Sequence, residues 1–218
     1  MIPKPGVTAE SYDREYFRTI PGERQTRFDR ARDDRVVALV SRHGPPANGD
    51  TWLLDIGCGY GHLLARFRDR YRIAGIDLSD HASGVAREAL PGTHVIQADI
   101  QRELPFGHRF GVVLAINVIE HLPDPRAAVR RITEALDPGG LCVIHLPTVN
   151  GPVSRLIYRF AYAGDPTHVY RPSGREVRRL FEAEGFEMVE GSFAPHTPWL
   201  LSGLGWHPAY LAAFRKRQ

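Results

Sequence analysis

A short apolar run that ends in a glycine-rich bend constrains the fold of this chain most strongly. The run spans Thr51 to Ile56, and the overlapping stretch LLDIGCGYG places glycines at positions 57, 59 and 61. Helix-compatible sequence begins at His62. This order predicts a buried strand, a tight turn and the start of a helix. Glycines remove side chains where a backbone bends sharply and approaches a ligand, and the N–H groups of a helix start can meet a polar or anionic ligand group.

The spacing of the glycines separates two classes of ligand. A dinucleotide-binding loop follows the pattern G-x-G-x-x-G, which from Gly57 and Gly59 would require a glycine where the chain has His62. The pattern present is D-x-G-x-G-x-G, from Asp55 to Gly61. The Asp55 carboxylate, at the strand end, can accept hydrogen bonds from the loop or from a ligand ammonium. Two alternatives stay open at this point: a glycine-rich turn without a ligand, and a nicotinamide site with a degenerate loop.

Length and charge place the chain among ordinary globular proteins. Its 218 residues most simply form one domain, and its net charge of +3 is too small to indicate nucleic-acid binding. Two cysteines, Cys58 and Cys142, give no disulfide framework, which fits a reduced compartment. The beginning of the chain lacks the apolar core of a signal peptide, and no run reaches the roughly 20 apolar residues of a membrane span. We therefore expect a cytoplasmic monomer or homodimer without membrane or nucleic-acid partners.

Strands and helices alternate along the rest of the chain. Because this alternation implies right-handed crossovers, it predicts a parallel sheet covered on both faces, which is a doubly wound α/β fold. The closing strands near the C-terminus can pair antiparallel. Strands are expected at 51–56, 72–77, 93–97, 110–116, 141–146, 186–193 and 209–214, and helices at 12–20, 24–43, 63–71, 79–90, 125–136 and 173–184.

Acidic residues follow the second and third predicted strands, at the edge where open α/β sheets bind ligands. Asp77 can accept both hydroxyls of a ribose, or it can interact with the dipole of the next helix, a role also open to Ser79 and Asp80. Asp99, in the turn Ala98-Asp99-Ile100, is placed to accept from an adenine amino group or is merely solvated.

Taken together, these motifs resemble the class I S-adenosylmethionine-dependent methyltransferases that act on small molecules. Between about residues 51 and 146, LLDIGCGYG resembles their glycine motif, IDLS their ribose-binding acid, QADI their adenine-binding turn, and FGVVLAINVIEHLPDP with LDPGG their fourth and fifth strands. DPTHVYRPSGREVRRLFEAEGF resembles a C-terminal segment common in the group. The resemblance implies a Rossmann-like, seven-stranded, mostly parallel sheet with an antiparallel last strand. It also implies S-adenosylmethionine as methyl donor and S-adenosylhomocysteine as product.

The resemblance also implies which residues hold the donor. Asp55 and Gly57 would lie near its methionine part, Asp77 at the ribose, Asp99 and Ile100 at the adenine, and the backbone of Asn117 and Val118 near the sulfonium. Tyr16 resembles part of an N-terminal helix that closes over the donor in relatives, although packing alone would also explain it. Cys58 is expected to be a small filler and not a nucleophile. The predicted donor-binding set is Tyr16, Asp55, Gly57, Cys58, Gly59, Gly61, Asp77, Leu78, Ala98, Asp99, Ile100, Asn117 and Val118.

The same comparison divides the single domain, 1–218, into four parts. N-terminal helices occupy 1–45, the donor-binding core occupies 51–146, a lid insertion follows at 147–172, and the C-terminal helix and closing strands fill 173–218. The lid interleaves aromatic residues with arginines, which favours a planar or acidic small-molecule acceptor. Packing against the sheet edge, with solvated arginines, explains the same composition equally well.

Two histidines are candidates for activating the acceptor. Methyl transfer releases a sulfide that needs no proton, so the protein chiefly aligns the nucleophile, but an alcohol, phenol or ammonium acceptor also needs a base. His121 follows Glu120 after the fourth predicted strand, and His168 lies in the lid with Asp165 placed to orient it. Either histidine can instead fix a loop by hydrogen bonds. His145, in an apolar strand, is more often structural.

The sequence therefore predicts a methyltransferase for a small molecule, with transfer to oxygen favoured and transfer to nitrogen or carbon left open. A non-catalytic donor-binding scaffold or partner subunit is the main alternative, and a nicotinamide dehydrogenase is a third. No metal site is predicted, because no histidine or cysteine cluster has ligand spacing in the sequence.

Overall fold

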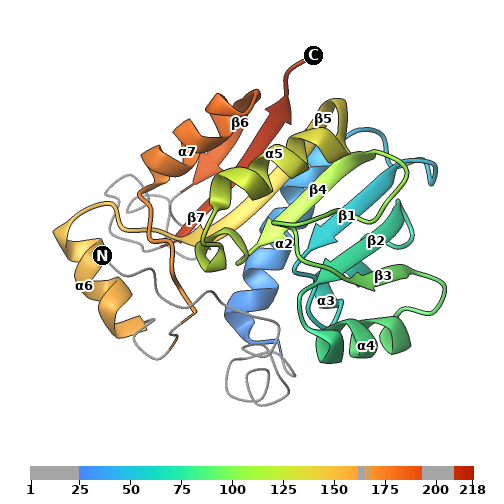
Figure 1. Ribbon diagram of the computed structural model, residues 1–218, viewed down its shortest axis with the longest axis horizontal. Coiled ribbons are helices and arrows are strands. Elements are labelled where there is room, and N and C mark those ends of the chain that lie inside the picture. Colours follow the sequence, from blue (N-terminus) through green and yellow to red (C-terminus); the bar gives the residue numbers. More distant parts are fainter. Residues whose placement is uncertain (1–24, 162–164, 166, 193–208) are drawn as a thin grey trace.

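The computed structural model describes residues 25–161, 165, 167–192 and 209–218. Its strands form a seven-stranded sheet in the order β3-β2-β1-β4-β5-β7-β6, with helices on both faces (Figure 1). The five parallel strands are β1 (Trp52–Ile56), β2 (Arg72–Asp77), β3 (His94–Gln97), β4 (Phe110–Ile116) and β5 (Leu136–Pro147). β7 (Ala209–Lys216) runs antiparallel to β5 and to β6 (Phe186–Ser192). The doubly wound α/β fold, with its antiparallel last strand, is confirmed.

Apolar side chains fill both faces of the sheet. On one face, α5 (Pro125–Ala135) and α7 (Gly174–Ala183) pack onto the strands, and the ring of Phe181 stacks on that of Phe214 with centroids 4.5 Å apart. On the other face lie α2 (Arg27–His43), α3 (His62–Ala65) and α4 (Asp80–Ala89). β4 is buried from Phe110 to Ala115, as a central strand covered on both sides should be. The sheet thus forms a rigid platform whose carboxyl edge carries the loops.

Capping side chains set several helix starts. Ser79 caps α4 by accepting from the N–H of Ala82, and Ser173 and Glu176 form the expected capping box at the start of α7. Asp124 caps α5, whose first residue is Pro125. Because each cap satisfies N–H groups that have no partner within the helix, these starts coincide with the predicted ones.

Two element boundaries in the described residues differ from the prediction by five residues or more. The helix expected over 63–71 ends at Ala65, because the next N–H groups bond three residues back, as in Phe67 to the carbonyl of Leu64, and continue the chain as turns. The strand expected over 141–146 begins already at Leu136, which pairs with Phe110 of β4. The expected helix at 12–20, and Tyr16 with it, lies outside the described residues.

The predicted lid contains a helix, α6 (Pro152–Ala161), which stands outside the two helical layers (Figure 1). Its Tyr158 is buried, whereas Leu156 and Phe160 are exposed. Among the described helices, none combines the length and the hydropathy that crossing a membrane requires.

Candidate functional site

A pocket opens at the carboxyl ends of β1, β2, β3 and β4. It is open to solvent on one side and has an interior volume of about 170 Å³. Its position at the carboxyl edge is the one expected for a doubly wound sheet. Residues of the predicted donor-binding set that line it are Gly57, Gly59, Asp77, Leu78, Ala98, Asp99, Ile100, Asn117 and Val118.

The glycine loop between β1 and α3 adopts backbone conformations that favour glycine. Gly57, Gly59 and Gly61 have φ angles of +70°, +52° and +80°. A Cβ atom on Gly57 would lie 2.5 Å from Cγ2 of Val118, so a larger residue would also collide with the neighbouring loop. The N–H groups of Gly57 and Cys58 both donate to the carbonyl of Ile76, at 2.7 and 3.0 Å, and hold the loop against β2.

Asp77 joins this loop to the start of α4. One carboxylate oxygen accepts from the N–H of Gly59 at 2.8 Å, and the other accepts from the N–H of Ser79 at 2.9 Å. Burial raises the pKa of Asp77, while these backbone N–H groups act to lower it. The side chain faces the pocket as well. Asp77 therefore binds the N-cap residue of α4 and also offers a carboxylate to a ligand, so the two roles considered for it are compatible.

Asp99 lies on the β3 side of the pocket. Its Oδ1 accepts from the N–H of Gln101 at 2.9 Å, and the Arg102 guanidinium lies 3.5 Å from its Oδ2. Ile100 beside it is buried and supplies an apolar wall. This end of the pocket combines an acceptor with apolar surface, a pairing that suits a purine ring bearing an amino group.

Three described residues of the predicted set do not line the pocket. Asp55 is 2% exposed, and burial, followed by the carboxylates of Asp33 and Asp77, raises its pKa well above the ordinary value. Cys58 packs onto β2, where a Cβ on Gly75 would come within 2.9 Å of its sulfur. Gly61 lies against α4 on the other side of the loop. A Cβ atom on Gly61 would lie 2.9 Å from the side chain of Leu90. The structure thus brings Asp77 and Asp99 into one pocket, whereas Asp55 is buried and does not line it.

The end of β4 is held by an unusual backbone conformation. Asn117 has a φ angle of +57°, the only positive value among the described non-glycine residues. Its N–H donates to the carbonyl of His145 at 2.7 Å, and its Oδ1 lies 2.6 Å from Nδ1 of the same histidine. His145 is buried on β5. This double contact with His145 fixes the backbone of Asn117 and Val118 at the pocket wall.

The two candidate catalytic histidines lie side by side. The rings of His121 and His168 have centroids 4.8 Å apart, and only His121 lines the pocket. Nδ1 of His121 lies 2.9 Å from Oγ1 of Thr167. Nδ1 of His168 lies 2.8 Å from the hydroxyl of Tyr158, and its Nε2 lies 3.4 Å from the carboxylate of Asp165, as the sequence predicted.

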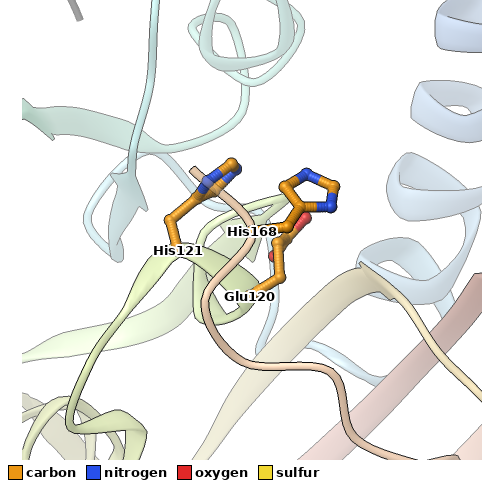
Figure 2. A group of neighbouring side chains, drawn as sticks. All are labelled: Glu120, His121 and His168. Carbon is orange, nitrogen blue, oxygen red and sulfur yellow. The ribbon is translucent and has the colours of Figure 1, made fainter. Parts of the chain in front are cut away.

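Burial dominates the electrostatics of this cluster. It lowers the pKa of His121 to about 4, with the neighbouring His168 adding to the effect, and it lowers the pKa of His168 as well. Both rings are therefore neutral at pH 7. Glu120 lies beside them, and burial raises its pKa to about 8 (Figure 2). Glu120 and His121 belong to the short 3-10 helix η2 (Ile119–His121), which follows β4. His168 lies in the segment after α6.

Residues 28–191 match a family described as a methyltransferase domain. The chain belongs to this family of methyltransferases. It is 32% identical over 205 residues to the ubiquinone biosynthesis O-methyltransferase of Nitrosospira multiformis, covering 82% of this chain and 81% of that protein. A trans-aconitate 2-methyltransferase of Rhodopseudomonas palustris is 34% identical over 105 residues, 47% of this chain and 41% of that one.

A solved structure has the same fold as this chain over almost its whole length. The N-methyltransferase NodS of Bradyrhizobium japonicum, in complex with S-adenosylhomocysteine, superposes with a TM-score of 0.67 at 18% identity, covering 96% of this chain and 97% of that one. The protein is a class I S-adenosylmethionine-dependent enzyme, and S-adenosylmethionine is its methyl donor. This assignment replaces the two alternatives left open for the glycine loop.

The pocket of the methyltransferase fits this donor. Asp77 and Asp99 offer acceptors for hydroxyl and amino groups, and Leu78, Ile100 and Val118 offer apolar walls. The missing Cβ of Gly57 lets the glycine loop pack closely against Val118 at the pocket wall. The individual contacts of these residues with the donor stay predictions.

Sequence reasoning missed two buried acids. Asp33 on α2 is 1% exposed, accepts from Gln25 at 2.7 Å and pairs with Arg32 at 2.8 Å. It lies three residues before the buried Val36, so helical periodicity already placed it on the inner face of α2. The other is Glu120, which is 1% exposed. Only its adjacency to His121 signalled it in the sequence.

Proposed function

We propose that this methyltransferase transfers a methyl group from S-adenosylmethionine to an oxygen atom of a small-molecule acceptor. One observation carries the proposal: His121, neutral at pH 7, lines the same pocket as the donor-binding loop, and its ring contacts that of His168. A neutral imidazole beside the transfer site suits an acceptor that must lose a proton.

The donor supplies an electrophilic methyl group on a positively charged sulfur. The acceptor oxygen forms a bond to the methyl carbon while the sulfur–carbon bond breaks and its electron pair stays on sulfur. The acceptor's proton leaves, so charge and atoms balance. The residues around Gly57, Asp77 and Asn117 position the donor, and productive transfer needs the acceptor oxygen within about 3–3.5 Å of the methyl carbon.

We assign activation of the acceptor hydroxyl to His121 and His168. Thr167 and Tyr158 hold the two rings at Nδ1, and both contacts come from the segment that includes α6 and the residues after it. The acceptor would enter next to this segment, so its aromatic and basic residues favour an aromatic or acidic molecule.

The names of the relatives support transfer to oxygen. The Nitrosospira protein is called an O-methyltransferase and aligns over most of both chains. NodS is called an N-methyltransferase but shares only the fold at 18% identity. Transfer to oxygen is therefore the stronger proposal, and transfer to nitrogen is the alternative that the experiment must distinguish.

Incubation with isotopically labelled S-adenosylmethionine tests this function. The acceptor panel holds phenols, aliphatic alcohols, carboxylic acids and amines, and mass spectrometry locates the label. We expect S-adenosylhomocysteine to form with a labelled O-methyl product from at least one oxygen acceptor. Labelled N-methyl products alone would contradict transfer to oxygen. Donor binding without transfer to any member of a broad panel would favour a scaffold.

A further inference from the structure

Three side chains with metal-ligating atoms meet beside the donor pocket. Glu120 and His121 come from η2, and His168 comes from the segment that crosses over it (Figure 2). One ligating atom from each residue lies within 4.8 Å of the other two. Because zinc–ligand bonds measure about 2.0–2.1 Å, two ligands of one ion lie at most about 4.2 Å apart. Small side-chain rotations would therefore close this group around an ion.

Backbone hydrogen bonds place His168 over Glu120. The carbonyl oxygen of Glu120 accepts from the N–H of Val169 at 3.0 Å and from the N–H of Tyr170 at 2.9 Å. These two bonds tie the segment after α6 to η2, immediately next to the cluster. The fold itself, and not the rotamers of long surface side chains, brings the three residues together.

Neighbouring hydroxyl groups orient the histidine rings. The Thr167 hydroxyl donates to the Asp165 carboxylate, so its oxygen accepts from Nδ1 of His121. A neutral ring that carries its proton on Nδ1 has its lone pair on Nε2. The Tyr158 hydroxyl lies 2.8 Å from Nδ1 of His168, and the Asp165 carboxylate lies 3.4 Å from its Nε2. Ligating histidines in metal sites are usually held by such partners at the other ring nitrogen.

The Glu120 carboxylate is a second, independent indication of a ligand. The residue is 1% exposed, and neither carboxylate oxygen has a hydrogen-bond partner among the residues that the structure describes. Arg32, whose charge acts on it, forms its ion pairs with Asp29 and Asp33. Buried polar groups of native proteins nearly always have a hydrogen-bond partner, so a buried carboxyl group without one indicates a ligand that is not part of the chain.

From these contacts we propose that Glu120, His121 and His168 bind one divalent first-row transition-metal ion of the zinc class. Two imidazole nitrogens and one carboxylate oxygen suit zinc and its neighbours better than magnesium or calcium, which prefer oxygen ligands. Three protein ligands leave a coordination position open. His121 lines the donor pocket, so the ion lies at the pocket wall.

The ion would help to deprotonate the acceptor hydroxyl, a step that rests on the proposed function. A hydroxyl group at the open position loses its proton more readily, because the cation stabilises the resulting oxyanion. The proton passes to solvent, and the oxygen then forms the bond to the methyl carbon. In the metal-bound enzyme the two histidines activate the acceptor hydroxyl through the ion that they hold, and they take up no proton themselves.

Metal binding by the purified full-length chain tests the site without an acceptor. Protein stripped with a chelator is titrated calorimetrically with Zn²⁺, and Co²⁺ is added separately because its visible absorption reports its coordination. We expect one ion per chain and at least about a tenfold loss of affinity in Glu120→Gln, His121→Ala and His168→Ala. His94→Ala removes an exposed histidine of β3 and should leave the affinity unchanged.

Thermal unfolding separates loss of a ligand from loss of the fold. A variant that melts like the wild type without metal, but lacks the zinc-induced rise in Tm, supports the site. Absence of stoichiometric binding, or binding that all three variants retain, overturns it. Methyl transfer by a chain that binds no metal refutes the metal site and leaves the proposed function standing. Stoichiometric binding that the three variants abolish, without transfer to any acceptor, supports the site and refutes the function.

Discussion

The carboxylate of Asp77 accepts a hydrogen bond from the backbone N–H of Gly59 at 2.8 Å. The two residues lie on different strand–helix units, and the contact holds the glycine loop after β1 against the end of β2. The same carboxylate faces the donor pocket. The shape of the loop and the chemistry offered to the donor therefore depend on one side chain.

Replacing Asp77 should weaken both folding and donor binding. Asp77→Ala leaves the N–H groups of Gly59 and Ser79 without their acceptor, which should lower the free energy of unfolding by about 1–3 kcal/mol. We expect the affinity for S-adenosylhomocysteine to fall at least about tenfold, because hydrogen bonds to a charged group are lost. Denaturant unfolding and isothermal titration calorimetry measure the two effects. Asp80→Ala, at an exposed neighbouring position, is the control, and equal affinities for both variants would contradict the role of Asp77.

Gly57 should tolerate no side chain. Gly57→Ala introduces a Cβ 2.5 Å from Val118 at a φ of +70°, so the loop must shift away from the pocket wall. Gly92 has a similar φ of +81°, and a Cβ atom added there would have no neighbouring atom within 4 Å. Gly92→Ala therefore introduces the backbone strain without the collision. We expect calorimetry to detect S-adenosylhomocysteine binding by Gly92→Ala but not by Gly57→Ala. Normal binding by Gly57→Ala would show that the loop does not set the pocket.

Asp55 should make the stability of the ligand-free protein depend on pH. Burial, with the carboxylates of Asp33 and Asp77, raises its pKa in the folded state above the ordinary value of 3.8. Asp55 then binds its proton more tightly in the folded protein than in the unfolded chain. The protonated Asp55 therefore contributes fully to the free energy of unfolding below pH 3.8. This contribution is lost as pH rises through the folded-state pKa.

The corresponding variant removes this dependence. The free energy of unfolding of the wild type should fall as pH rises from about 4 to about 7, and it should fall less steeply in Asp55→Asn. Urea unfolding at a series of pH values measures both slopes. Asp80→Asn should follow the wild type, and identical slopes for all three proteins would mean that Asp55 titrates as it does in the unfolded chain.

Thr167 should affect turnover more than donor binding. Its hydroxyl connects Asp165 to His121, and Thr167 does not line the donor pocket. Thr167→Val keeps the shape but removes the acceptor at Nδ1, so kcat should fall about tenfold while the KM for the donor stays unchanged. Steady-state kinetics with an acceptor found in the panel measures both constants. Thr93→Val, at the start of β3, is the matched control, and a rise in the donor KM alone would contradict the assignment.

The parts of the fold that have a local chemical cause could be predicted from the sequence. Apolar runs gave the strands, and the caps at Ser79 and Ser173 gave helix starts. The end of α3 could not be predicted, because three of the six residues from Arg66 to Tyr71 are arginines, which favour a helix, whereas Phe67 and Tyr71 pack into the core from a run of turns. Tertiary packing thus overrode helix propensity at this point.

The donor side of the site could be predicted for a similar reason. Asp77 and Asp99 follow strand ends, and parallel strands bring such positions to one edge. The approach of His168 to His121 could not, because these residues are distant in sequence and are brought together by hydrogen bonds between their two segments, including those to the Glu120 carbonyl. The absence of ligand spacing in the sequence therefore said nothing about a metal site assembled from two separate segments.

Calorimetric titration of the wild-type chain with S-adenosylhomocysteine tests the central claim most directly, namely that the pocket between Gly57 and Ile100 holds the methyl donor. We expect one binding site per chain, strongly weakened by Asp77→Ala and retained by Asp80→Ala. No measurable binding by folded wild-type protein, or binding that Asp77→Ala leaves intact, would contradict it.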